Sequence, residues 1–259
     1  MSNSSRSEAS DSDMSRVAPL PVLPKYFTDE SNRPQRVRAM FDASAGDYDW
    51  ITSVMSFGSG RWYRRDALRR IGLGAGMKLL DVGAGTGVVA LVGQQMVGSE
   101  GLVVAADPSQ GMLGQARSSG VRHVVPALGE RLPCAAGVFD LVTMGYALRH
   151  VADLRALFLE YARVLKPGGK VLVLEITRPR GFLGHAFLKF YLGRIVPLLA
   201  RVVRRSAHTQ TLMQFYWDTI ENCVPPDTIL AAMRAAGLTD VRRHVIFGIF
   251  SEYTAEKPR

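Results

Sequence analysis

The sequence predicts an α/β protein with a doubly wound, mostly parallel, Rossmann-like sheet of seven strands and a helical lid insert. Short apolar runs of strand length alternate with helical stretches along most of the chain. The run at 77–82 closes on a glycine-rich turn at 83–87, Gly-Ala-Gly-Thr-Gly. The next apolar run, 102–106, ends in Asp107. Strand, glycine turn, helix, strand and acid follow one another in the order of a nucleotide-binding βαβ unit.

The remaining elements follow from local patterns. Further strands are expected where short apolar or β-branched runs occur, at 121–127, 139–144, 171–176, 241–248 and 249–253. Helices are expected after the glycine turn, at 109–116 with Ser109 as N-cap, at 153–165 before the Lys-Pro-Gly-Gly at 166–169, and at 227–236 before Gly237. In such a sheet ligands bind at the carboxyl ends of the strands, so we expect the site beside the first, second and fourth strands.

The chain of 259 residues is long enough for one such domain and needs no second one. Residues 1–33 begin with a stretch rich in Ser, Asp and Arg, which predicts a disordered tail without a secretory signal. We therefore expect the domain to extend from 34 to 259. Cys134 and Cys223 lie far apart and lack the spacing of a zinc site, so we expect no metal and a reducing, cytoplasmic location.

The acid before the glycine turn indicates which nucleotide is bound. Asp81 stands two residues before Gly83, where its charge would repel a pyrophosphate but favour a ligand with an ammonium and a sulfonium group. S-adenosylmethionine is such a ligand. Asp107 would then accept both ribose hydroxyls, and Gly83 and Gly85 would let the backbone approach the methionine moiety. The alternative is that the glycines only shape a turn and Asp107 caps the next helix.

The formal net charge of +9 is concentrated in one segment. Between Glu175 and Asp218 there is no acidic residue, and basic residues alternate with bulky apolar ones, which predicts a helical insert at about 178–222. Lys189, Arg194 and Pro197 exclude a membrane span. Two interpretations stay open: peripheral contact with an anionic membrane, on the inner face, or a helical lid packed on its own domain. The mixed apolar character disfavours nucleic acid and an RNA-modifying enzyme.

Three stretches resemble the ubiquinone and menaquinone biosynthesis C-methyltransferases, a family of class I S-adenosylmethionine-dependent enzymes. They are Tyr48-Asp49 with Met55-Ser56-Phe57-Gly58 and Trp62, the pair Leu148-Arg149, and Arg-Val-Leu-Lys-Pro-Gly-Gly-Lys-Val-Leu-Val-Leu-Glu at 163–175. The resemblance implies transfer of a methyl group to a ring carbon of a lipophilic polyprenyl quinol. It also implies cofactor contacts at Thr86, Asp107, Leu128, Gly129 and Gly145.

Two departures from this family bear on the predicted site. Leu128 stands where the family usually has Asn or Asp, so backbone groups near Gly129 would have to recognise the adenine amino group. His150 stands where an Asn normally follows the arginine. An alternative acceptor is therefore another hydrophobic phenolic or polyketide-like molecule of secondary metabolism. The oligomeric state, including a homodimer, stays open.

Three residues are candidates for the chemistry at the acceptor. A hydroquinone ring carbon becomes nucleophilic when the adjacent hydroxyl loses its proton. Arg149 cannot be the base, because a guanidinium stays protonated, but it can stabilise the developing phenolate. His150 could accept the proton, and Tyr48 could orient the acceptor. The alternative for His150 is that it caps a helix or faces solvent.

Overall fold

The computed structural model describes residues 16–21, 23–27, 32–55, 60–177 and 207–259, together with 181, 184, 186, 189–191 and 194. The predicted tail before residue 16 and most of the predicted insert before residue 207 lie outside the described residues. Within the described part, seven strands form one sheet in the order β3-β2-β1-β4-β5-β7-β6. Its strands are β1 (Lys78–Val82), β2 (Leu102–Asp107), β3 (His123–Pro126), β4 (Phe139–Gly145), β5 (Leu165–Ile176), β6 (Thr239–Ile246) and β7 (Phe250–Glu256).

The first five strands of the sheet are parallel, and β7 pairs antiparallel with both β5 and β6. The mostly parallel sheet of the prediction is confirmed. The predicted strand 241–248 runs too far, because Phe247 and Gly248 take positive φ angles of 52° and 73° and form the turn between β6 and β7. Two strands joined by so short a turn must run antiparallel.

The helices begin where the sequence supplies caps. The Ser109 hydroxyl accepts a hydrogen bond of 3.1 Å from the Met112 N–H and starts α5 (Gln110–Ser118). The Asp153 carboxylate accepts one of 2.9 Å from the Arg155 N–H and starts α6 (Leu154–Val164). Ser109 is the predicted N-cap, and such caps stabilise a helix by about 1 kcal/mol.

The stretch after α6 differs from the prediction. The chain turns directly into β5 at Leu165, and the pairing register jumps from Phe139↔Leu165 to Leu141↔Lys170. The Lys-Pro-Gly-Gly stretch at 166–169 forms this irregularity, and at Gly169 a Cβ would lie 3.1 Å from the Phe139 carbonyl oxygen. The stretch therefore ends the helix, as predicted, but inside the strand.

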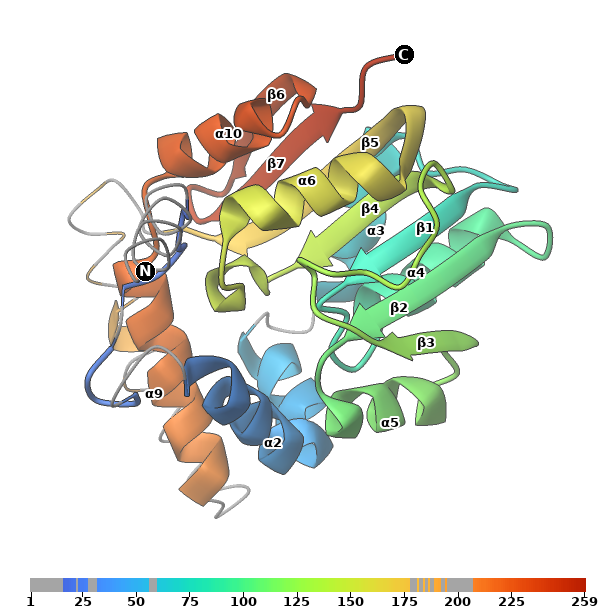
Figure 1. Cartoon of the computed structure of the whole chain (residues 1–259). Coiled ribbons are helices and arrows are strands. Elements are labelled where there is room, and N and C mark those ends of the chain that lie inside the picture. The colour runs from blue at the N-terminus through green and yellow to red at the C-terminus, as the bar shows by residue number, and fades with distance from the viewer. Residues whose placement is uncertain are drawn as a thin grey trace, which may run out of the picture.

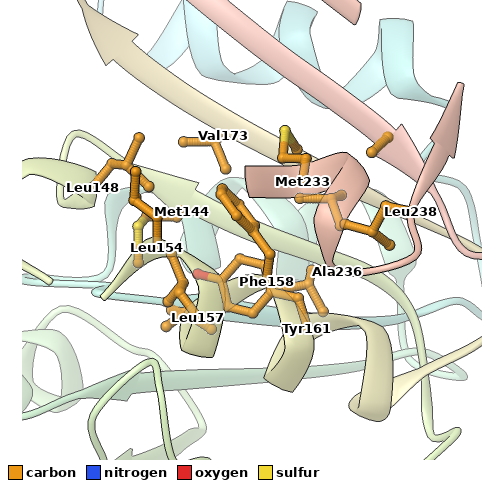
Figure 2. Packing of buried hydrophobic residues seen from close by; sticks show 14 of the residues in the cluster. Met144, Leu148, Leu154, Leu157, Phe158, Tyr161, Val173, Met233, Ala236 and Leu238 are labelled. Carbon is orange, nitrogen blue, oxygen red and sulfur yellow. The ribbon is translucent and has the colours of Figure 1, made fainter. Parts of the chain in front are cut away.

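Helices cover both faces of the sheet (Figure 1). On one face, α6 packs on β5, and α10 (Pro226–Ala235) packs on α6 and β6. Figure 2 shows Phe158 and Tyr161 of α6 beside Met233 of α10 and Ala236, which follows α10. On the other face, α3 (Gly60–Ile71) and α4 (Val88–Val97) bury a second apolar cluster. Each buried Leu or Phe in these layers contributes about 1.5–3 kcal/mol.

A third cluster closes the carboxyl edge of the sheet. There α2 (Arg33–Met55) packs on α9 (Ala207–Asn222), beyond the edge to which the arrowheads of β1 and β4 point (Figure 1). Within the described residues, no helix is long and apolar enough to cross a membrane.

Part of the expected tail belongs to the folded domain. Leu20 and Phe27 are each 1% exposed, and the Val17 N–H donates to the Asp153 carboxylate at 3.0 Å. The expected start of the fold near Pro34 is therefore too late for the described residues between 16 and 27. Residues 17–24 are all apolar or proline, unlike the polar residues before them, so the change in composition is a signal that could have marked the end of the tail.

Candidate active site

The glycine turn lies at the carboxyl end of β1, facing the end of β4. Gly83, Gly85 and Gly87 take φ angles of 63°, 56° and 84°, a left-handed backbone that glycine adopts without strain. A Cβ added to Gly83 would lie 2.6 Å from the Cβ of Ala147. Gly83 therefore serves both the turn and a close approach of chain segments, whereas Gly85 serves the turn.

Asp81 lies inside the sheet just before this turn and is fully buried. Its Oδ1 accepts a hydrogen bond of 2.9 Å from the Thr143 hydroxyl on β4, whereas Oδ2 has no partner among the described residues. Burial raises its pKa to about 7, although the Thr143 hydrogen bond and the charge of Arg64 oppose this rise. A buried carboxylate with a bare oxygen is a site for a cationic or hydrogen-bonding ligand.

Asp107, at the end of β2, is also buried, and two backbone N–H groups orient it. Its Oδ2 accepts from Gly85 at 2.8 Å and its Oδ1 from Ser109 at 2.8 Å. Burial raises its pKa to about 6, and these two hydrogen bonds oppose the rise. Each oxygen keeps a second lone pair for a further donor, so the carboxylate ties the glycine turn to α5 and can still accept from a ligand.

The other predicted cofactor positions line the same edge. Leu128 is 52% exposed and begins a tight turn in which the Arg131 N–H donates to its carbonyl at 3.1 Å. At Gly129 a Cβ would lie 2.6 Å from a methyl carbon of Leu157, and at Gly145 one would lie 3.2 Å from Val89. Thr86, in the glycine turn, is buried. The glycines keep the backbone close to its neighbours, and Leu128 offers an apolar surface beside them.

Arg149 is fully buried in the short 3-10 helix η1 (Leu148–His150). Its Nη1 donates to Oε2 of the buried Glu175, at the end of β5, at 2.5 Å. Burial opposes its charge, but the Glu175 carboxylate outweighs this and raises the pKa of Arg149 above its usual value. Arg149 is therefore a guanidinium ion held by a counter-ion, with Nη2 lacking a partner among the described residues.

His150 lies between two aromatic rings. Its ring centroid lies 5.2 Å from that of Phe41 on α2 and 5.4 Å from that of Phe215 on α9. Burial, together with the charges of Arg149 and Arg33, lowers its pKa well below the usual value. Neither ring nitrogen has a hydrogen-bond partner within the described part of the chain. The imidazole is therefore neutral, and both of its ring nitrogens are buried although the residue as a whole is partly exposed.

Tyr48 completes the cluster from α2. Its ring lies 6.0 Å from that of Phe41, and a Cβ on Gly85 would lie 3.9 Å from its Cε1. Burial, followed by the neighbouring Tyr216 hydroxyl, raises its pKa well above the usual value, so the phenol stays protonated. Tyr48 thus links the glycine turn to the Arg149 and His150 cluster, and all three predicted acceptor residues come together.

Aromatic side chains on α9 cover this cluster. Phe215, Tyr216 and Trp217 are buried, and the Arg149 guanidinium lies 4.9 Å from the centre of the Tyr216 ring. A separate groove of about 470 Å³ between α3 and α4, beside Trp62 and Leu91, lies on the outer surface and contains none of the predicted site residues.

Two partners of Arg149 were missed by sequence reasoning. Glu175 forms the ion pair, and the Thr219 hydroxyl accepts from Arg149 Nε at 3.3 Å. Glu175 ends an apolar strand run just as Asp107 does, and that shared position is the signal that could have identified it. No sequence signal singles out Thr219 on α9.

Among the described residues, no group of three or more His, Cys, Asp or Glu side chains is arranged to hold a metal ion. The site is instead built from carboxylates, a guanidinium, phenols and a neutral imidazole. This set can bind a cationic ligand and stabilise an oxyanion next to it.

Comparison with solved structures supports the fold. A methyltransferase from Aquifex aeolicus has a TM-score of 0.55 at 18% identity and covers 75% of this chain and 89% of its own. The phosphoethanolamine N-methyltransferase 2 of Haemonchus contortus, solved with S-adenosyl-L-methionine, has a TM-score of 0.60 at 18% identity, covering 84% of this chain and 57% of its own. At this identity the likeness extends to the fold alone.

Sequence relatives are closer. The demethylmenaquinone methyltransferase of Mycolicibacterium vanbaalenii is 36% identical over 227 residues, 86% of this chain and 96% of the relative. That of Corynebacterium urealyticum is 36% identical over 231 residues, 87% of this chain and 95% of the relative. Residues 29–257 match the model of the ubiE/COQ5 methyltransferase family. With the methyltransferase fold, the glycine turn and nearly the whole length matched, this chain belongs to the ubiE/COQ5 methyltransferase family.

Proposed function

We propose that this enzyme transfers a methyl group from S-adenosylmethionine to a ring carbon of a lipophilic polyprenyl quinol in menaquinone or ubiquinone biosynthesis. The observation that carries the proposal is the juxtaposition of two sets of side chains at one sheet edge. Asp81 and Asp107 flank the glycine turn, and Tyr48, Arg149 and His150 lie beside it under apolar α2 and α9. The relatives named as demethylmenaquinone methyltransferases make demethylmenaquinol the first acceptor to test.

The residues fit the proposed cofactor. When bound, S-adenosylmethionine supplies a methyl group already activated on a positively charged sulfur. The bare Oδ2 of Asp81 suits its cationic end, and the two carboxylate oxygens of Asp107 suit ribose hydroxyls. The remaining proposed contacts are backbone or apolar, at Gly83, Gly85, Thr86, Leu128, Gly129 and Gly145.

At the acceptor, each residue has a distinct proposed task. Arg149 would stabilise the phenolate oxygen through its partnerless Nη2, since Glu175 holds the other side of the guanidinium. His150, whose imidazole is neutral, would accept the hydroxyl proton. After the new carbon–carbon bond has formed, the same ring carbon would release its hydrogen as a proton to water, which restores the aromatic ring. Tyr48, kept protonated, would donate a hydrogen bond that orients the ring.

The direct test is methyl transfer in a purified system. The enzyme is incubated with chemically reduced, short-chain demethylmenaquinol and methyl-labelled S-adenosylmethionine, and the product is analysed by fragment-ion mass spectrometry. We expect one label on a ring carbon. Label on an oxygen, or no product with this acceptor and with demethylated ubiquinol precursors, would contradict the assignment and favour another hydrophobic phenol.

We also propose that the enzyme works at an anionic membrane, where a polyprenyl acceptor resides. Trp62 at the start of α3 is 64% exposed, and Arg61 before it is exposed too. The next residue, Tyr63, connects this part of α3 to the end of the sheet, because its ring lies 5.1 Å from that of Phe250 on β7. On the adjacent turn between β6 and β7, Phe247 is 79% exposed. Exposed aromatic and basic side chains together favour an anionic lipid interface.

Vesicle sedimentation tests this membrane proposal. Phe247→Ala should weaken binding to phosphatidylglycerol vesicles about threefold, whereas Leu159→Ala, which removes a 47% exposed side chain from α6, should not change it. Equal binding of all three proteins, or equal binding to phosphatidylcholine vesicles, would contradict it.

A further inference from the structure

Arg64 on α3 is a second guanidinium at the site, and the proposed chemistry at the acceptor does not use it. Its central carbon lies 4.9 Å from the centre of the Tyr146 ring, at the end of β4 next to Gly145. Its Nη1 donates to the Gly60 carbonyl, one turn earlier on α3, at 3.0 Å. Its Nε is buried and has no hydrogen-bond partner in the described part of the chain.

Arg64 also differs from two other arginines in its surroundings. Arg149 is paired with Glu175, and Arg70 is paired with Glu252. Among the described residues, no carboxylate forms an ion pair with Arg64. A half-buried guanidinium without a counter-ion keeps its donors available to an anion.

The location of this cation is informative because Asp81 is close by. Burial raises the pKa of both Asp81 and Tyr48, and the positive charge of Arg64 opposes this rise in each case. The guanidinium therefore lies within electrostatic range of the glycine turn and of the acceptor cluster. Asp81 and Arg64 nevertheless form no ion pair with each other. Among the described residues, neither Oδ2 of Asp81 nor Nε of Arg64, both buried, has a hydrogen-bond partner. An amino-acid zwitterion has an ammonium and a carboxylate group, and the Asp81 carboxylate and the Arg64 guanidinium are complementary to these two charges.

We propose that Arg64 binds the carboxylate of the methionine moiety of S-adenosylmethionine, while Asp81 accepts its ammonium group. This inference rests on the proposed cofactor and adds a positioning residue to it. A guanidinium suits this task because its planar donors match the geometry of a carboxylate. The two residues would fix the amino-acid end from opposite sides and so orient the sulfonium toward the acceptor cluster.

Calorimetric binding of two thioether ligands tests this inference without any turnover. S-adenosylhomocysteine carries the amino-acid end, whereas 5′-methylthioadenosine lacks it. Arg64→Ala should weaken S-adenosylhomocysteine binding at least about tenfold and leave methylthioadenosine binding within about twofold. The S-adenosylhomocysteine affinity of Arg64→Lys should lie between those of Arg64→Ala and the natural protein, because lysine keeps the charge and loses the planar donors.

The neighbouring residue provides a matched control. Arg65 is exposed and donates to Gln95 Oε1 at 2.5 Å on the outer face, so Arg65→Ala should leave the affinity for both ligands unchanged. If Arg64→Ala does not fold, Arg64→Gln keeps part of the packing on Tyr146 and should show the same ligand dependence.

Equal losses for both ligands in the Arg64 variants would overturn the inference and leave Arg64 a structural role beneath Tyr146. Unchanged binding of both ligands would overturn it too. If the natural protein binds S-adenosylhomocysteine but does not methylate quinols, the proposed acceptor fails and the role of Arg64 is still decided by these titrations.

Discussion

Asp81 and Arg149 are both fully buried charged residues at the carboxyl edge of one sheet, yet they are held in opposite ways. Asp81 accepts a hydrogen bond from a neutral hydroxyl on one oxygen and has no hydrogen-bond partner on the other among the described residues, whereas Arg149 faces the carboxylate of Glu175. Because a lone buried charge is costly and a paired one is much less so, the two centres have different uses. The Asp81 carboxylate remains available for a cationic ligand, and the Arg149 guanidinium is fixed in place before any ligand arrives.

The largest expected effect comes from breaking the paired centre. Glu175→Ala leaves Arg149 buried without its counter-ion, and the free energy of unfolding should fall by about 3–5 kcal/mol in urea denaturation. Arg242→Ala removes an ion pair with Asp240 whose side chains are 74% and 56% exposed, and should cost less than about 1 kcal/mol. Equal losses in the two variants would show that Arg149 does not depend on its partner.

The glycine turn gives the second largest effect. Gly83→Ala puts a Cβ 2.6 Å from that of Ala147 in a backbone with positive φ, so we expect a loss of about 3 kcal/mol and of cofactor binding. Gly76→Ala is the control, since its φ of 76° is similar and no atom lies within 4 Å of the added Cβ. That variant should lose only about 1 kcal/mol. Thermal unfolding compares them, and similar losses would mean that the contact with Ala147 does not matter.

The unpaired centre predicts a pH dependence of binding. A cationic ligand favours ionised Asp81, whose pKa is about 7, so S-adenosylmethionine affinity should rise about tenfold or more between pH 5.5 and 7.5. In Asp81→Asn, only a weaker dependence below pH 6 should remain, from Asp107 with its pKa of about 6. Calorimetry at several pH values measures this, and the same slope in both proteins would exclude Asp81 as its source.

The raised pKa of Asp81 also makes the folding stability of the ligand-free protein depend on pH, and this dependence has the opposite sign to that of cofactor binding. A carboxyl group whose pKa is higher in the folded than in the unfolded state binds protons more strongly when folded. Its contribution to stability is therefore lost as the pH rises from about 4 to about 7. The cofactor should offset that loss, because it is expected to bind the ionised form.

The smallest expected effect concerns the acceptor cluster. Tyr48→Phe removes one hydroxyl and keeps the ring contact with Phe41, so turnover should fall about fivefold, the equivalent of one hydrogen bond. S-adenosylhomocysteine affinity should not change. Steady-state kinetics and calorimetry together separate the two effects, and a loss of cofactor affinity would move Tyr48 to the cofactor side of the site.

The cofactor side of the site was largely predictable from the sequence because it is local. Asp81, the glycine turn and Asp107 belong to one βαβ unit, and parallel pairing of β1 with β2 brings them to the same edge. The Ser109 cap and the helix at 153–165 follow from short-range patterns in the same way, whereas the order of the strands across the sheet was not predicted. The position of Leu128 followed from the family resemblance, but its exposure did not.

The acceptor side could be predicted only in part because its members lie far apart in the chain. Tyr48, Arg149 and Thr219 meet through three different helices, and nothing in the local sequence indicates that Arg149 is paired with Glu175. The neutral state of His150 likewise depends on Phe41 and Phe215, which are distant in sequence. The burial of Phe27 likewise depends on a distant residue, because its ring lies 5.9 Å from that of Phe215.

The most direct test of this account is a calorimetric titration of the purified protein at pH 7.5 with S-adenosylmethionine and, separately, with NAD⁺. We expect S-adenosylmethionine to bind one molecule per chain, Asp81→Asn to weaken that binding, and NAD⁺ to give no heat of binding. Strong NAD⁺ binding without a response to S-adenosylmethionine would contradict the assignment of Asp81 as the acceptor of a cationic ligand.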